Sequence, residues 1–186
     1  VGVDSTTANK YLHVLRELRL VEREIPLTDG NPLRSRRGTY HIADRFLAFH
    51  FRHVQPNVSL INAGRGTKVF EERVLPDLPR LFEEARDDFV VDHLKRSAAE
   101  WIDDEIIEAS HHRPGERVRA LARTAEGRTV AAIVLPDEER PEADVREELH
   151  SLGGPFSEID HVLLYRFTAR ANAPLEVEVV PNEVFA

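Results

Sequence analysis

The fold is decided by two adjacent stretches, STTANKYLHVLREL at residues 5–18 and RLVEREIPLTDGNPLRSRRGTYHI at residues 19–42. The first stretch has leucine at three-residue spacing, which is typical of the apolar face of an amphipathic helix. Either Asp4 or Ser5 can cap the helix, because both side chains accept hydrogen bonds from the free backbone N–H groups of a first turn. The first stretch therefore predicts a helix.

The second stretch predicts a two-stranded hairpin. Residues 20–25 and 38–42 have the composition of strands, and residues 26–37 form a polar tip rich in Gly, Pro and Asn between them. A helix followed by such a hairpin has the order of a recognition helix and a wing. The sequence thus favours a winged-helix unit that contacts duplex DNA.

The residues expected to contact DNA lie on the polar face of the helix and at the basic tip of the wing. The helix residues would enter the major groove. The wing arginines would bind phosphates or contact the minor groove. These residues are Thr7, Asn9, Lys10, His13, Arg16, Arg34, Arg36 and Arg37. The alternative is that the helix docks on another protein module and that its polar face is only solvated.

Charge is unevenly distributed along the chain. Residues 1–60 carry 9 Lys and Arg against 6 Asp and Glu, whereas the whole chain has a net charge of −8. A basic segment joined to an acidic body fits a module that approaches phosphates with one end. The other reading of this difference is ordinary scatter in charge.

Composition limits the class of protein. There is no cysteine, so disulfides and thiolate metal sites are excluded, and no apolar run approaches the roughly 20 residues of a membrane helix. We therefore expect a cytoplasmic protein with no membrane partner. Its 186 residues suit two small domains, and the absence of methionine from a chain that begins at Val1 predicts a fragment of a longer protein.

After the wing, residues 44–54 predict a largely buried helix capped by Asp44 and ended by Pro56. Residues 62–67 predict a turn-rich connection, and residues 68–101 predict further helices interrupted by Pro76 and Pro79. We place the domain boundary in the connection. The expected domains are a winged-helix unit at residues 1–60 and an α/β unit at residues 68–186.

The second half has the alternating and continuous apolar patterns of strands. We expect strands at residues 117–123, 129–135, 161–167 and 175–180, the last at an edge, with a short helix at residues 144–152. Residues 109–115 are expected to form a surface loop. The helix at residues 78–94 should pack on one face of the sheet, and no internal repeat is evident. The fold class is α/β, or α+β overall, with a partial winged helix first.

Several residues together resemble a known family. The pattern Leu15-x-x-Leu18-x-Leu20-Val21, the run from Gly38 to Phe49 and the motif Val54-x-Pro56-Asn57 are similar to the region that follows the ATPase module in archaeal AAA+-type ATPases. The resemblance implies a winged helix followed by a small restriction-endonuclease-like domain of the PD-(D/E)xK type. Only three lysines among 25 basic residues and the acidic surplus also resemble haloarchaeal composition.

The resemblance also implies where nuclease chemistry would lie. Such a nuclease binds a divalent cation through an Asp on one strand and the Glu of a Glu-x-Lys motif on the next. Here the two strands read Val118-Arg119-Ala120 and Ala132-Ile133-Val134, so only Glu83 on the preceding helix matches an acidic position. We expect a degenerate nuclease-like domain with no catalytic residues, no metal and no cofactor, Glu83 being a weak metal candidate.

Three other groups could carry chemistry. His50 and His53 have a helical spacing that metals can use, although core histidines are more common, and His111 with His112 could hold zinc loosely beside residues 103–105. The segment at residues 64–68 superficially resembles a phosphate loop. It lacks the required spacing between its second glycine and the lysine, so we interpret it as a linker.

Three functions remain open. The first is a non-catalytic DNA-binding and interaction region of an archaeal ATPase-like protein. Its partners would be duplex DNA, the ATPase module of the same chain or another protein, with a homo-oligomer as a further possibility. The second is a stand-alone winged-helix transcription regulator with a sensing or dimerisation domain. The third is a divalent-metal-dependent nuclease that uses Glu83, Asp103, Asp104 or Glu108.

Overall fold

The computed structural model describes residues 4–29, 35, 37–112, 117–135, 147, 149–152, 156, 158–167 and 176–181. The chain forms two compact units. One unit contains residues 1–24 and 38–83, and the other contains residues 25–37 and 84–186. The predicted domain bounds, residues 1–60 and 68–186, stay a prediction. None of the helices in the described ranges combines the length and the apolar content that crossing a bilayer requires.

The first unit begins with α1 (Ser5–Glu17), as the leucine spacing predicts. Asp4 is its N-cap, since one carboxylate oxygen accepts from the Thr7 N–H at 2.8 Å and the other from the Thr7 hydroxyl at 2.9 Å. Arg16 in the last turn lies at the negative end of the helix dipole. No residue of α1 is buried within this structure. The helix therefore depends on little packing of its own.

The predicted hairpin is confirmed. Strands β1 (Val21–Glu24) and β2 (Thr39–Ile42) pair antiparallel, with Val21 opposite Ile42. The Arg23 guanidinium lies over the Tyr40 ring, 6.0 Å from its centroid. A Cβ at Gly38 would lie 2.5 Å from the Arg23 side chain, so this side chain occupies the space that glycine leaves.

A helical hairpin follows, and here Pro56 does not end the helix as the sequence suggests. The first arm runs through α2 (Arg45–Phe49), the π-helical segment η2 (His50–Val54), the 3-10 turn η3 (Gln55–Asn57) and α3 (Val58–Asn62). Proline cannot donate to a preceding carbonyl, and the irregular turns accommodate that loss without breaking the helix. Asp44 caps α2 as predicted, through a 2.8 Å bond from Leu47 N–H.

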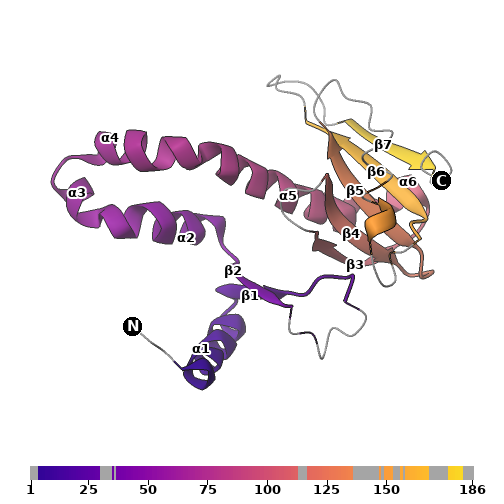
Figure 1. Cartoon of the computed structure of the whole chain (residues 1–186), viewed down its shortest axis with the longest axis horizontal. Helices are drawn as coiled ribbons and strands as arrows, with labels where there is room; N and C mark the ends of the chain where they lie inside the picture. The colour runs from indigo at the N-terminus through magenta and orange to yellow at the C-terminus, as the bar shows by residue number, and fades with distance from the viewer. Residues whose placement is uncertain are drawn as a thin grey trace. The chain divides into compact units, whose positions relative to one another are not determined.

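The second arm repeats this succession. It contains α4 (Gly66–Val69), the π-helical segment η4 (Phe70–Val74), the 3-10 turn η5 (Leu75–Asp77) and the long helix α5 (Leu78–Ser97), which begins where the sequence predicts (Figure 1). The turn between the arms includes Gly64 at φ +77°. The expectation of a largely buried helix at residues 44–54 is wrong, because Phe46 is 74% exposed and only His53 in this range is buried.

The second unit is built on a five-stranded sheet. Its strands are β3 (Ile106–His111), β4 (Val118–Thr124), β5 (Thr129–Leu135), β6 (His161–Arg166) and β7 (Glu176–Pro181), in the order β3-β4-β5-β6-β7. All neighbours pair antiparallel except β5 and β6, which are parallel. The mixed α/β class is thus confirmed, and β7 is the predicted edge strand.

Both faces of this sheet are covered. Val90, Val91 and Leu94 of α5 pack with the side chains of one face, and the short α6 (Ala99–Ile102) adds Ile102. The opposite face forms a second cluster with Leu149, Phe156 and Ile159. Covering on two sides explains why all seven residues of β5 are buried and why its sequence is a continuous apolar run.

Three segments of this unit differ from, or add to, what the sequence suggests. The prediction of a surface loop at residues 109–115 is wrong for residues 109–111. These three residues belong to β3 and pair with β4. The predicted helix at residues 144–152 lies partly outside the described residues, and those described at 149–151 are helical. Leu27, from the tip of the wing, is 4% exposed and belongs to the core cluster of this unit.

Candidate functional site

The polar face of α1 is the first candidate site. Asn9, Lys10, His13 and Arg16 are all exposed on this helix. His13, Arg16 and Asn9 stand three or four residues apart, so they lie along one side of the helix. His13 Nε2 lies 3.4 Å from Glu17 Oε1, and this carboxylate places a negative charge at the end of the face. The arrangement offers two permanent cations and one amide to a partner.

Thr7 differs from the other predicted contacts because its side chain is already used. Its hydroxyl and its N–H both donate to Asp4, and these bonds lower the pKa of the Asp4 carboxyl, the backbone bond most strongly. The structure therefore gives Thr7 a capping role at the start of α1. A DNA contact by Thr7 would have to compete with that role.

The wing is described only in part. Arg34 and Arg36 lie outside the described residues, so the structure does not place them. Arg37 is exposed, and its backbone N–H donates to Ser35 Oγ at 3.0 Å. The Ser35 hydroxyl in turn donates to Asp29. These bonds fold the described part of the tip locally, with Arg37 at its end.

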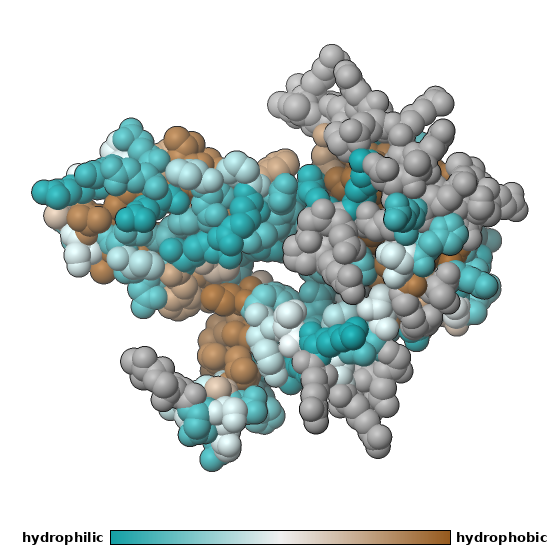
Figure 2. Space-filling model, in the orientation of Figure 1, coloured by the Kyte–Doolittle hydropathy of each residue, from teal (hydrophilic) through white to brown (hydrophobic). Residues whose placement is uncertain are grey.

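The other side of α1 is apolar and uncovered. Tyr11, Val14 and Leu18 are 65%, 49% and 61% exposed, and Leu20 in the following turn is 38% exposed. Figure 2 shows hydrophobic residues in brown where α1 meets the hairpin. A helix of 13 residues is marginal in water without packing of an apolar face. Packing of another protein surface against this apolar face would therefore stabilise α1.

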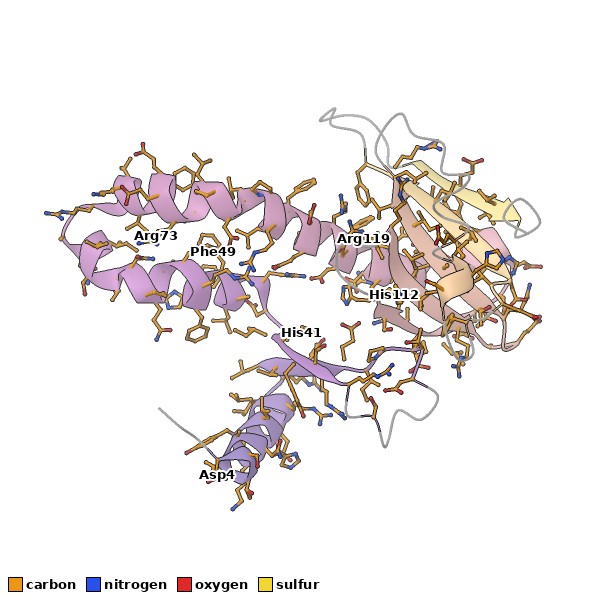
Figure 3. The ribbon with its side chains drawn as sticks, in the orientation of Figure 1. Asp4, His41, Phe49, Arg73, His112 and Arg119 are labelled. Carbon is orange, nitrogen blue, oxygen red and sulfur yellow. The ribbon has the colours of Figure 1, made fainter. Side chains whose placement is uncertain are left out.

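A charged cluster on the sheet unit is the second candidate site. Arg119 of β4, labelled in Figure 3, lies with its Nη1 atom 3.4 Å from Asp87 Oδ2 of α5. Arg86 lies beside the same carboxylate, with its Nε atom 3.6 Å from Asp87 Oδ1. The three side chains are between 14% and 18% exposed. Glu83, one turn earlier on α5, is exposed.

His111 extends this cluster from β3. Its Nε2 atom lies 3.0 Å from Asp88 Oδ1 of α5. The possible zinc group suggested for this region is divided in the structure, because Asp104 contacts Arg128 of the β4–β5 turn instead, at 3.1 Å. Within the described ranges, no three His, Asp or Glu side chains gather closely enough to hold a metal ion.

The helical hairpin holds a third candidate site, a cleft of about 590 Å³ between its arms. His53, whose side chain is 6% exposed, lies with its Nε2 atom 3.0 Å from Asp77 Oδ2 on the other arm. The lining residues are Arg52, His53, Pro56, Asn57, Glu72, Arg73, Pro76 and Asp77. His50 is not in the cleft and stacks on Phe46, so the two histidines do not form a metal pair.

A last group of polar atoms lies under α5 in the sheet unit. The fully buried Tyr165 hydroxyl lies 2.9 Å from His93 Nδ1. Burial raises the pKa of Tyr165 and lowers the pKa of His93, so the phenol stays protonated and the imidazole stays neutral. The two neutral groups therefore share one hydrogen bond, whose direction depends on the His93 tautomer. This pair has the character of a satisfied core contact.

The pairs Arg119–Asp87 and His53–Asp77 and the cleft were not predicted from the sequence. One signal was present for the cleft. Pro56-Asn57 and Pro76-Asp77 are separated by 20 residues, and each lies in the 3-10 turn of its arm. The expectation of no internal repeat therefore overlooked a repeated structural element.

Comparisons with known proteins are sparse. An uncharacterized protein of Methanocaldococcus jannaschii, MJECL04, is 38% identical over 64 residues, which are 34% of this chain and 14% of that protein. The match thus spans a small part of the relative's length. No protein-family profile matches the chain. No solved structure gives a significant match.

Proposed function

We propose that this chain is a non-catalytic, DNA-contacting and interaction region of an archaeal ATPase-like protein. In this proposal, α1 and the β1–β2 wing form a winged-helix unit that lies on duplex DNA. The sheet unit is a degenerate nuclease-like domain that serves assembly. The observation that carries the proposal is the exposed polar face of α1, directly followed by an antiparallel hairpin.

The chemistry of that face supports contact with a duplex. Asn9 and Arg16 are residue types that bond base edges in the major groove, and Lys10 suits a phosphate. All three are exposed, and they have no tertiary role among the described residues that binding would disrupt. A helix with its apolar side toward a protein partner and its polar side toward DNA matches the docking geometry of winged helices.

The charged cluster supports the non-catalytic part of the proposal. The resemblance implies a metal-binding Asp in the strand segment Val118-Arg119-Ala120. At that place Arg119 extends a guanidinium to Asp87 of α5 instead. A permanent cation beside the carboxylate would repel a divalent metal from this position. The sheet unit then acts as a folded body for protein contact rather than as a hydrolytic centre.

The DNA contact can be tested by charge reversal on α1. The double variant Lys10→Glu/Arg16→Glu removes two cations that face the DNA and adds two repulsive charges. We expect at least a tenfold loss of affinity for a fluorescent duplex at low salt, measured by anisotropy. The slope of log K against log salt should fall by about 1 for each phosphate that the variant no longer neutralises.

The matched control is Lys95→Glu/Arg96→Glu, which makes the same charge change at exposed positions in the last turn of α5. This control should bind the duplex nearly as tightly as the wild type. Equal losses in both variants, or an unchanged affinity of the α1 variant, would contradict DNA contact through α1. Circular dichroism at 222 nm would check that α1 remains helical.

A further inference from the structure

The cleft in the helical hairpin is lined symmetrically by the two arms. Four lining residues come from the first arm at positions 52, 53, 56 and 57, and four from the second arm at positions 72, 73, 76 and 77. Each set begins in a π-helical segment and ends in a 3-10 turn that contains proline. Equivalent backbone irregularities in both arms therefore face each other across the cleft.

These irregularities explain why a cleft lies there. A π turn inserts one extra residue and locally widens the helix, and such turns occur frequently at functional sites. Val69 and Val74 are buried within this hairpin, and His53 reaches Asp77 at 3.0 Å. The His53–Asp77 contact joins the arms, and the cleft of about 590 Å³ beside it is largely open to solvent.

The carboxylates that line the cleft are neutralised by neighbouring cations. Asp77 Oδ1 accepts from Arg80 Nε at 2.8 Å and Asp77 Oδ2 from Arg80 Nη2 at 3.1 Å. Glu72 pairs with Lys68 at 3.6 Å, one helical turn earlier. Both carboxylates of the lining thus have cationic partners, Lys68 for Glu72 and chiefly Arg80 for Asp77, which also lies near His53 and Arg52.

Arg73 remains as an uncompensated charge of the lining. This residue, labelled in Figure 3, makes no hydrogen bond or ion pair with any residue that the structure describes, and it lies on the cleft side of its arm. Arg52 lines the same cleft from the other arm, where its charge also acts on Asp77. Bonds from Arg80, more than any other cause, hold the pKa of Asp77 low, so this carboxylate stays charged and keeps Arg80 engaged.

We propose that this cleft binds a small anion through a phosphate or carboxylate group, with Arg73 as the principal ligand and Arg52 opposite it. Guanidinium groups bind both oxyanions through paired N–H donors. A divalent cation is disfavoured, because the two carboxylates already have cationic partners. The volume lies within the range of small-molecule sites, which is about 300–1,000 Å³. This inference does not depend on the DNA contact proposed for α1.

The test uses the full chain and two probes, inorganic phosphate and malonate. Binding is followed by NMR through the side-chain amide of Asn57, which lines the cleft and donates to the His53 carbonyl at 2.8 Å. Ionic strength is held constant with sodium chloride. We expect a saturable shift of the Asn57 amide with at least one probe, and the probe that binds more tightly identifies the anion class.

The decisive variant is Arg73→Ala, which should weaken binding about tenfold or more, as expected for removal of a charge-assisted hydrogen bond. Arg73→Lys should retain part of the affinity, because the charge is kept. The matched control, Arg65→Ala, removes an exposed arginine just before α4 that does not line the cleft, and it should bind as the wild type does. A lack of saturable shift with both probes, or equal binding by Arg73→Ala and Arg65→Ala, would overturn the proposal.

Discussion

The Tyr165 side chain is fully buried in the sheet unit, and its hydroxyl is hydrogen-bonded to His93 Nδ1. The His93 ring also stacks on Phe89 with ring centroids 5.8 Å apart and contacts the edge of Trp101. The imidazole therefore stays neutral in an aromatic surrounding. Protonation would place a charge in this partly buried surrounding, beside the Tyr165 hydroxyl.

The pair predicts a pH dependence of stability. Because burial lowers the pKa of His93 below its ordinary 6.5, the unfolded chain binds a proton more readily than the folded chain in this range. The free energy of unfolding should therefore fall as pH drops below about 6.5. His93→Gln cannot titrate and should show a smaller fall, measured by urea unfolding between pH 5 and 8.

Tyr165→Phe is the matched control for this effect. It removes one buried hydrogen bond, which should cost about 1 kcal/mol while His93 is neutral, and it leaves the titrating imidazole in place. An equal pH dependence in His93→Gln and the wild type would show that another group dominates this range.

For individual residues, helix caps could be predicted from the sequence, whereas ion pairs between residues far apart in the chain could not. Asp44 was predicted as a cap and Asp4 was one of two candidates with Ser5, since a cap depends only on the three residues that follow it. The pair His53–Asp77 joins residues of different arms. Arg119–Asp87 similarly depends on how α5 packs on β4. No spacing rule in the sequence specifies either contact.

The helical hairpin and the β4–β5 hairpin contain glycines with different backbone roles. Gly127, between β4 and β5, has φ +82°, a conformation that disfavours any residue with a Cβ. Gly66 has no such conformation and is the first residue of α4. No atom lies within 4 Å of a Cβ built at either position. Backbone conformation alone therefore distinguishes them.

Alanine substitution should separate these two roles. Gly127→Ala should lower the free energy of unfolding by about 1 kcal/mol through strain at positive φ. Gly66→Ala should raise it by up to about 0.5–1 kcal/mol, because alanine loses less backbone entropy in a helix. Thermal unfolding of both variants gives the comparison. A change of the same sign in both would contradict this explanation.

Elements with a strong local signal were predicted well. Helix α1, strands β5 and β6 and the start of α5 all follow from periodicity or from a continuous apolar run. The continuation of the first arm through Pro56 was not foreseen, because π and 3-10 turns leave no mark in apolar spacing. Strand β3 was missed because its last four residues are Glu-Ala-Ser-His, which have little β-branched or aromatic character.

At the scale of the molecule, the wing is more than a surface hairpin. Residues 25–37 belong to the same compact unit as the sheet, and Leu27 is 4% exposed in its core cluster. The sequence suggests only a free polar tip for this segment. A single leucine between polar neighbours gives no indication of burial, so this anchoring could not be predicted from pattern alone.

Leu27→Ala should therefore destabilise the sheet unit. Removal of a buried leucine typically costs about 2–5 kcal/mol, part of it from the cavity that remains. We expect faster hydrogen exchange in β4, β5 and β6, measured by mass spectrometry. The control is Leu60→Ala, which truncates a leucine that is 42% exposed in the helical hairpin and should change stability by less than about 0.5 kcal/mol. Unchanged exchange in Leu27→Ala would contradict the anchoring.

The position of Leu27 also has a consequence for the order in which the chain folds. The ribosome makes the wing before any strand of the sheet, so the Leu27 side chain leaves the exit tunnel before its core partners exist. Its burial must wait for the strand residues of the same core cluster, such as Leu121 and Ile133, and contacts of such long sequence separation form slowly. During synthesis, the nascent wing therefore carries an exposed leucine that could recruit a chaperone until the sheet closes over it.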